Sequence, residues 1–314
     1  MSYCRVRWLR RLEYHLQIES PLDLSASNAS GGELALTDQA GIDRLQAVRA
    51  AYARQVCAIA GIPPGGGIEA ALAVIPREQF VGPPPWRVVT PRGGACSKSD
   101  DPAILYQDVL VTLGGEPGLN NGQPSLHVLC IAALHLRAGE RVVHVGAGTG
   151  YYTAVLARLA GETGLVDAYE IEPDFAERAK ANFAGFQQVE VHARSGAVGP
   201  LPECDAIYVN AAAAEPLAVW LDSLRPGGRL LFPLGGRDGA GEMLLLTRGE
   251  AEFSAQFLSQ VQFVPLIGAQ DEQASRALRV AFRRGGAKRV RRLVRNDTPD
   301  PTCWLAGKGW WLGE

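Results

Sequence analysis

The sequence predicts an α/β fold built on a mainly parallel sheet with helices on both faces. Short apolar runs alternate with amphipathic segments after residue 138, and a glycine-rich loop joins the first such run to the first such segment. In addition, 47% of the 314 residues are hydrophobic and 20% are charged, which suits a chain that buries a full core. Strands separated by helices pair in parallel through right-handed crossovers, so this alternation predicts the sheet.

The alternation itself occupies residues 138–268, which we expect to form the core of the protein. Short apolar runs, each about the length of a strand, alternate with amphipathic segments that have the period of a helix. The pattern runs through 141–146, 151–160, 165–172, 173–184, 189–194, 204–211, 216–224, 228–234 and 241–248. In such a sheet, ligands bind beyond the carboxyl ends of the strands where the strand order reverses.

Three further regions flank this core. Residues 1–35 end in a Ser/Gly/Asn-rich stretch and are expected to be an N-terminal extension. Residues 36–137 are expected to form a helical lead-in and a cofactor or substrate loop segment, with helices over 43–59 and 68–75 and a long loop over 81–102, which is rich in Pro and Gly.

The remaining residues, 269–314, are expected to form a C-terminal extension. Arg and Lys alternate there with apolar residues at roughly helical intervals, which favours a solvated helix face packed on the core over a dedicated anion-binding patch. Three indoles, Trp304, Trp310 and Trp311, follow closely and need a place to be buried. We therefore predict that the tail docks on the core.

Charge and cysteine content exclude several classes of function. The net charge is -2 and the isoelectric point is about 6.2, so no global basic field predicts a nucleic-acid or membrane partner. No apolar run reaches the roughly 18 to 20 residues that span a bilayer, and no signal peptide is expected, which predicts a cytoplasmic protein. The 6 cysteines are scattered, which indicates neither a disulfide framework nor a metal site.

The glycine loop predicts a nucleoside-containing cofactor. Gly146, Gly148 and Gly150 follow an apolar run directly, so their backbone N–H groups can approach a ligand. The dinucleotide fingerprint needs glycine one position later, where Tyr151 stands, and this disfavours NAD. Glu170 ends the next strand and can accept hydrogen bonds from both ribose hydroxyls.

Glu172 is the alternative carboxylate for this ribose contact, because strand boundaries shift by a residue or two.

Several segments resemble one enzyme family in the same order along the chain. They are AVIPREQFVG, NNGQP, VGAGTG, VNAAAAEP, RPGGRLLFPLGG and QFVPLIG, within residues 43–268. Together they resemble the protein-L-isoaspartate O-methyltransferase family. The resemblance implies a Rossmann-like class I methyltransferase fold with a seven-stranded sheet whose last strand is antiparallel. It also implies S-adenosyl-L-methionine as cofactor and, as substrate, a peptide or protein with a free carboxylate.

The resemblance also implies the site residues. Asn120 and Gly122 are expected at the catalytic position. The expected cofactor-binding residues are Asn121, His127, His144, Gly146, Ala147, Gly148, Glu170, Ile171, Ser195, Gly196 and Asn210. Some of these assignments have a structural alternative. His127 can simply lie on one face of the helix that follows Pro124, and the asparagine pair can simply form a turn.

Three positions depart from the family pattern. Gly122 replaces a serine whose hydroxyl lies near the transferred methyl group, His144 replaces an acid, and Ser195 replaces an aspartate that contacts the adenine. Each change removes an oxygen ligand or a charge. Generic isoaspartyl peptides are therefore expected to be poor substrates, and Gly122→Ser is expected to raise the rate on them if the loop tolerates a side chain.

Three functions remain in competition. The first is a carboxyl O-methyltransferase with a substrate context other than, or narrower than, general isoaspartyl repair. The second is general isoaspartyl repair, and the third is a catalytically silent cofactor-binding module. A carboxylate is already ionised at neutral pH, so the first two need alignment more than a general base.

Overall fold

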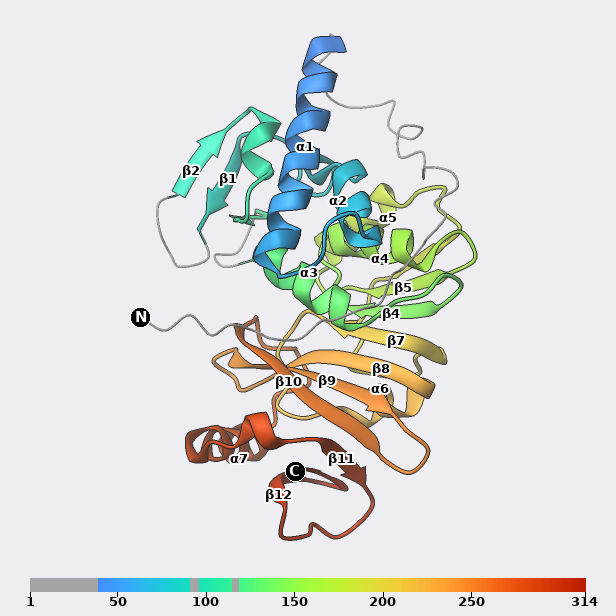
Figure 1. Ribbon diagram of the computed structural model, residues 1–314, viewed down its shortest axis with the longest axis vertical. Coiled ribbons are helices and arrows are strands. Elements are labelled where there is room, and N and C mark those ends of the chain that lie inside the picture. The colour runs from blue at the N-terminus through green and yellow to red at the C-terminus, as the bar shows by residue number, and fades with distance from the viewer. Residues whose placement is uncertain (1–38, 91–95, 115–118) are drawn as a thin grey trace.

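The computed structural model describes residues 39–90, 96–114 and 119–314, so the expected extension at 1–35 lies outside them. A sheet of ten strands, in the order β12-β13-β11-β10-β9-β8-β7-β4-β5-β6, forms the body of the molecule. Figure 1 shows the helical lead-in at one end of this sheet and the C-terminal tail at the other. The predicted α/β architecture is confirmed.

Five of the strands form the parallel part of the sheet. They are β4 (Arg141–Val145), β5 (Leu165–Tyr169), β6 (Val189–His192), β7 (Cys204–Val209) and β8 (Leu224–Gly235). The chain runs outward from β4 through β5 to β6, then returns to β7 on the other side of β4. The order therefore reverses between β4 and β7, and the carboxyl ends of these two strands meet at the switch point.

The seven-stranded sheet with an antiparallel last strand is corrected in two details. β9 (Ala240–Arg248) pairs antiparallel with both β8 and β10 (Phe253–Gln262), so β9 is the strand that runs against the others. β10, the seventh strand of the core, therefore runs in the same direction as β8. The C-terminal tail then adds three more strands beyond β10.

The tail forms a helix and three strands rather than one long helical face. α7 (Glu272–Arg284) is followed by β11 (Arg292–Arg295), β12 (Cys303–Gly307) and β13 (Trp310–Gly313). β11 pairs with β10, and the β12–β13 hairpin pairs with β11 through β13. The basic run therefore ends its helical period at Gly285 and continues with the alternating period of a strand, which corrects the prediction.

The predicted docking of the tail is confirmed. Trp304, Trp310 and Trp311 are 5%, 7% and 3% exposed. The Trp304 ring meets Phe257 of β10 and Phe282 of α7 edge-on, at centroid distances of 5.4 and 5.3 Å. Its Nε1 also donates a 2.8 Å hydrogen bond to the Gly285 carbonyl. A large apolar face of the sheet is thus covered by the chain's own C-terminal residues.

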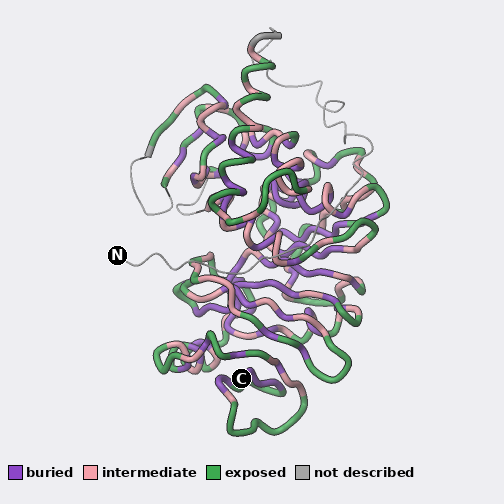
Figure 2. The backbone as a smooth tube through the Cα atoms, in the orientation of Figure 1, coloured by how far each residue is buried: buried purple, intermediate pink, exposed green. Residues whose placement is uncertain are grey.

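Two hydrophobic clusters sandwich the sheet, as the alternation of residues along β4 requires. Val142 belongs to the cluster shared with the lead-in, whereas Val143 belongs to the cluster shared with the tail. Helices α1 (Gln39–Ile59), α2 (Gly67–Val74), α3 (Pro124–Ala133), α4 (Tyr151–Ala160) and α5 (Pro173–Asn182) supply the first cluster, and α6 (Ala218–Ser223) and α7 the second. Figure 2 shows the buried residues concentrated along the strands between them.

The lead-in contains the two expected helices, α1 and α2, and a small sheet. The segment 81–102 was expected to be a loop, but it holds β1 (Trp86–Val89) and β2 (Cys96–Ser99), which pair antiparallel. β3 (Leu110–Val111) pairs with the other edge of β1. Short 3-10 helices at Arg77–Gln79 and Pro102–Leu105 join these parts. None of the helices in the described residues has the length and apolar character of a membrane span.

Candidate active site

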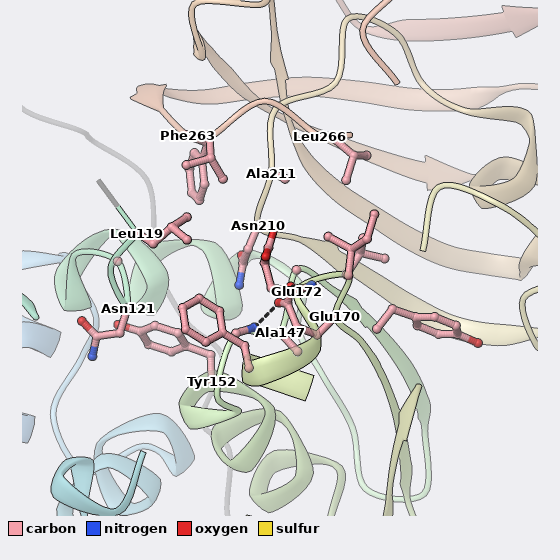
Figure 3. Close-up of a pocket in the computed structure, with 18 of the residues that line it drawn as sticks. Leu119, Asn121, Ala147, Tyr152, Glu170, Glu172, Asn210, Ala211, Phe263 and Leu266 are labelled. Carbon is pink, nitrogen blue, oxygen red and sulfur yellow. Dashed lines mark hydrogen bonds between the residues drawn. The ribbon is translucent and has the colours of Figure 1, made fainter. Parts of the chain in front are cut away.

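A cavity of about 260 Å³ lies at the switch point, beyond the carboxyl ends of β4, β5 and β7. In Figure 3, Leu119, Asn121 and Tyr152 form one side of it and Glu170 and Glu172 the other. Of the residues predicted for the site, those that line the cavity are Asn120, Asn121, Gly122, His127, Gly146, Ala147, Gly148, Glu170, Ile171, Ser195, Gly196 and Asn210. His144 does not line it.

The glycine loop lines one side of this cavity and needs its glycines for backbone reasons. Gly146, Gly148 and Gly150 have φ values of 72°, 57° and 101°, a region that side-chain-bearing residues rarely adopt. A Cβ on Gly150 would also lie 2.5 Å from the Phe183 ring. The N–H of Gly146 donates to the Tyr169 carbonyl at 2.9 Å, which fixes the loop against β5.

Glu170 braces the same loop. Its Oε2 accepts a 2.6 Å hydrogen bond from the Gly148 N–H, and its Oε1 accepts a 2.9 Å bond from the Glu172 N–H. Glu170 is only 6% exposed, and this burial raises the pKa of its carboxyl group above the usual value. A carboxylate oxygen can accept two hydrogen bonds, so the side chain retains acceptor capacity for a ligand beyond its backbone partners.

His144 lies behind the cavity wall and orients Asn210, which corrects its expected place in the site. The Asn210 side-chain N–H donates to His144 Nε2 at 2.7 Å, so the proton of the neutral ring lies on Nδ1 and is donated to Thr153 Oγ1 at 2.8 Å. Complete burial lowers the pKa of His144 to about 3. Asn210 Oδ1 is buried and has no hydrogen-bond partner among the described residues.

The asparagine pair lines another side of the cavity. Asn120 Oδ1 accepts a 2.8 Å hydrogen bond from the Gly122 N–H, and Asn121 Oδ1 accepts a 3.0 Å bond from the Val111 N–H of β3. These bonds make the turn that the sequence left open. Asn121 Nδ2 is buried and has no partner in the described part of the chain.

Gly122 is closely opposed by His127. Its φ is 75°, and a Cβ built on it would lie 2.0 Å from His127 Nε2. Gly122→Ser would therefore cause both backbone strain and a steric clash. In the parent chain this substitution is not expected to raise the rate.

The far end of the cavity is shaped by Ser195 and Gly196. Ser195 Oγ accepts a 3.1 Å hydrogen bond from the Ala197 N–H, so the hydroxyl stabilises the turn. A Cβ on Gly196 would lie 2.7 Å from the Val145 side chain, which explains why glycine stands there. The Gly196 carbonyl accepts a 2.8 Å bond from Trp220 Nε1, which fixes this turn to α6.

Sequence reasoning missed the apolar wall of the cavity. Phe263 and Leu266, which follow β10, cover it from the side opposite the glycine loop (Figure 3). The other missed lining residues are Leu113, Leu119, Val145, Thr149, Tyr151, Tyr152, Tyr169, Phe175, Ala211, Gln262, Val264, Pro265 and Ile267, whereas Glu172, the alternative ribose carboxylate, also lines the cavity. The segment QFVPLIG carried part of this signal, because an apolar turn between two polar segments needs a partner surface.

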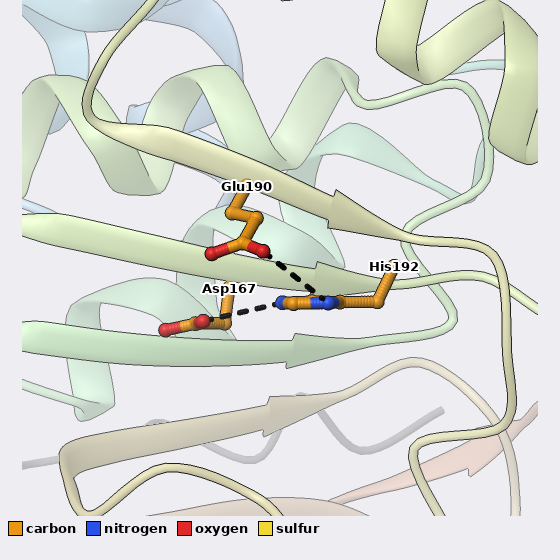
Figure 4. A group of neighbouring side chains, drawn as sticks. All are labelled: Asp167, Glu190 and His192. Atoms are coloured by element: carbon orange, nitrogen blue, oxygen red, sulfur yellow. Dashed lines mark hydrogen bonds and ion pairs between the residues drawn. The ribbon is translucent and has the colours of Figure 1, made fainter.

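A separate cluster of Asp167, Glu190 and His192 lies on β5 and β6 and contains the ligand types of a metal site (Figure 4). The imidazole stands between the two carboxylates, with Nε2 3.2 Å from Asp167 and Nδ1 3.8 Å from Glu190. Arg141 already contacts both oxygens of Asp167, at 2.8 and 3.1 Å. This cluster is therefore explained as an ion-pair network on the sheet.

The switch point, the glycine loop and the carboxylate after the second strand together define a Rossmann-like class I methyltransferase fold, and solved structures agree. One, titled protein-L-isoaspartate O-methyltransferase, matches with a TM-score of 0.58 and 24% identity over 75% of this chain and 69% of its own. Another, from Plasmodium falciparum in complex with S-adenosyl-L-homocysteine, matches with a TM-score of 0.56 and 19% identity over 69% of this chain and 97% of its own. The predicted fold class is confirmed.

The family follows from the sequence comparisons. The model of the protein-L-isoaspartate(D-aspartate) O-methyltransferase family matches residues 96–271. The protein-L-isoaspartate O-methyltransferase of Rhodopseudomonas palustris is 35% identical over 67% of this chain and 91% of its own length. A relative from Marinobacter nauticus, protein-L-isoaspartate O-methyltransferase 2, is 35% identical over 72% and 95%. The chain belongs to this family, as the sequence predicted.

Proposed function

We propose that this chain binds S-adenosyl-L-methionine in the cavity and transfers its methyl group to a carboxylate of a peptide or protein. The observation that carries the proposal is the meeting of two different halves in one cavity. The glycine loop and Glu170 form one half, which we call the cofactor half. The Asn120–Gly122 turn and His127 form the other, which we call the acceptor half because the methyl acceptor would bind there. Relatives that cover two thirds of the chain bear the name of this activity, which supports it.

The residues of the first half fit the cofactor. Glu170 has unused acceptor capacity for the two ribose hydroxyls, and Gly196 leaves room beside Val145 at the adenine end. Asn210 Oδ1 is a buried acceptor without a partner in the described residues, and a ligand amino group would satisfy it. An orphaned buried polar atom is costly without a ligand, so it indicates that one binds here.

When bound, S-adenosyl-L-methionine supplies an electrophilic methyl group on a sulfonium centre. The substrate carboxylate is ionised at neutral pH and needs no base, in keeping with a cavity whose nearby histidines are neutral. Burial lowers the pKa of both His127 and His144 to about 3. The chain's own contribution is therefore to align the acceptor and to exclude water, which Leu119, Phe263 and Leu266 do as apolar wall residues.

A second candidate is general repair of isoaspartyl residues. The absence of a side chain at position 122 favours a narrower substrate context, but His127 Nε2 occupies the space where such a side chain would lie. A polar group is thus present at that point of the cavity, and this observation favours activity on ordinary isoaspartyl peptides.

The test is calorimetry followed by a transfer assay. The proposal predicts saturable binding of S-adenosyl-L-methionine and of S-adenosyl-L-homocysteine, and no detectable binding of NADH. It then predicts transfer of a tritiated methyl group to an L-isoaspartyl peptide. Cofactor binding without transfer to any peptide carboxylate would favour the silent binding module instead. Failure to bind either cofactor would contradict the proposal entirely.

A further inference from the structure

His127 occupies the space that a side chain at position 122 would fill. A Cβ built on Gly122 would lie 2.0 Å from His127 Nε2, 2.7 Å from Cδ2 and 3.1 Å from Cε1. The edge of the imidazole that carries Nε2 therefore faces Gly122, and both residues line the cavity. This position of the His127 ring therefore requires glycine at 122.

The imidazole is held rigidly in this place. It stacks on Tyr152, with ring centroids 3.7 Å apart and an interplanar angle of 12°. Its Nδ1 is 2.7 Å from the Tyr208 hydroxyl. His127 is only 3% exposed, and burial, with smaller contributions from His144 and Arg77, lowers its pKa to about 3. The ring is therefore neutral at physiological pH and carries one proton.

The contact with Tyr208 links the direction of the phenol hydroxyl to the tautomer of the His127 ring. A phenol hydroxyl donates readily, and the Tyr208 hydroxyl lies within hydrogen-bond distance of His127 Nδ1. When the hydroxyl donates to Nδ1, the single ring proton lies on Nε2. The nitrogen that faces Gly122 is then a donor, fixed in orientation by the stack and the phenol.

The neighbouring asparagine oxygens are engaged by the backbone. Asn120 Oδ1 and Asn121 Oδ1 are both engaged by backbone N–H groups, at 2.8 and 3.0 Å. Asn121 Nδ2 is buried and has no partner in the described residues. With Tyr208 donating to Nδ1, His127 Nε2 is the donor that this side of the cavity offers, and a carboxylate oxygen is a ligand that accepts such a bond.

We propose that His127 Nε2–H binds and orients the acceptor carboxylate, in the place of a side chain at position 122. The inference rests on the proposed function and deepens it. The carboxylate uses one oxygen to form the new O–CH3 bond, the C–S bond breaks, and its electron pair stays on sulfur. No proton moves in this step, so His127 remains neutral and acts through alignment.

The first test compares variants on an L-isoaspartyl peptide. His127→Phe keeps an aromatic ring for the Tyr152 stack and removes both nitrogens. It should lower kcat/KM by about ten- to a hundredfold while the Kd for S-adenosyl-L-homocysteine changes less than about twofold. His127→Gln restores a donor and should recover part of the loss. An unchanged kcat/KM in His127→Phe would overturn the inference.

The second test exchanges the two positions. Gly122→Ser should lower kcat/KM in the parent, where the imidazole fills the space, and should raise it in the His127→Ala background, where that space is open. The positive φ at 122 penalises serine in both backgrounds, so it cancels from the comparison. Equal effects of Gly122→Ser in the two backgrounds would contradict the inference.

The third test does not depend on turnover. Nitrogen-15 NMR of the histidines in the full chain should show the His127 proton on Nε2, and its signal should shift when the L-isoaspartyl peptide and S-adenosyl-L-homocysteine are added. A proton on Nδ1, or no shift on addition, would overturn the inference. If the parent transfers no methyl group while the proton lies on Nε2 and its signal shifts, the proposed function fails and the assignment of His127 stands.

Discussion

The two halves of the cavity are built by different means. In the cofactor half, glycines at positive φ shape the backbone, and Glu170 accepts hydrogen bonds from that backbone. In the acceptor half, side chains do this work: Asn120 and Asn121 make the turn, and His127 fills the space above Gly122. The first half therefore tolerates little change in backbone, whereas the second depends on contacts between pairs of residues.

Each half also contains one fully buried neutral histidine, and the two act differently. His144 lies behind the wall and orients Asn210 through Nε2, with its proton on Nδ1. His127 lines the wall and presents Nε2 to the cavity. The same residue type thus supports a ligand group in one half and serves as one in the other. The predictions below separate the halves.

The largest expected effect is in the cofactor half. Glu170→Ala removes the ribose acceptor and the brace on Gly148, and should weaken S-adenosyl-L-methionine binding by about ten- to a hundredfold in a calorimetric titration. The matched control is Glu172→Ala, which removes a neighbouring carboxylate that also lines the cavity. A larger loss in Glu172→Ala than in Glu170→Ala would move the ribose contact to Glu172.

The next effect is on stability and involves both halves. Burial lowers the folded-state pKa of His127 and His144 to about 3, below the ordinary value of 6.5. Between these values the unfolded state binds more protons, so stability should be full above pH 6.5 and fall as the pH decreases toward 3. Each histidine contributes about 1.4 kcal/mol per pH unit. Urea denaturation of the parent and His127→Phe from pH 4.5 to 7.5 measures this, and an equal slope in both would contradict burial of a neutral His127.

A smaller effect is expected in the acceptor half. Asn121→Asp keeps the oxygen that accepts from the Val111 N–H but replaces the free donor with a charged acceptor. The added charge should repel the substrate carboxylate and lower kcat/KM for an isoaspartyl peptide about tenfold. Cofactor affinity measured by calorimetry should change little. A loss confined to cofactor affinity would assign Asn121 to the other half.

The smallest effect tests the support behind the wall. Thr153→Val removes the acceptor of the His144 Nδ1 proton without changing the cavity lining. Loss of one neutral hydrogen bond contributes about 1 kcal/mol, so cofactor binding should weaken about fivefold through Asn210. The peptide KM at saturating cofactor is the control and should stay constant. A selective rise in that KM would place His144 in the acceptor half.

The cofactor half was predictable from the sequence because its signal is local. Three glycines in five residues, a preceding apolar run and an acid about twenty residues later mark a loop whose geometry depends on few other contacts. The residues of the acceptor half were expected from the resemblance, but their arrangement was not predictable, because it depends on pairs far apart in the chain. His127 contacts Tyr208, which is 81 residues away in the sequence, and no short sequence pattern predicts that contact.

The fold shows the same division. The strand and helix alternation of residues 138–268 predicted the parallel sheet, since each element carries its own period. The C-terminal strands were missed because their basic residues follow a helical interval in α7 and then alternate in β11, and only pairing with β10 distinguishes the two. Likewise, β1 and β2 form in a segment rich in Pro and Gly because each pairs with the other.

The most direct test of the central claim is transfer of a tritiated methyl group from S-adenosyl-L-methionine to an L-isoaspartyl peptide. The same peptide with an ordinary aspartyl residue is the control. If the cavity binds cofactor and methyl acceptor as proposed, base-labile label should appear on the isoaspartyl peptide and little on the control. In Glu170→Ala, labelling of the isoaspartyl peptide at limiting cofactor should be strongly reduced. Tight cofactor binding with no label on the isoaspartyl peptide would contradict it.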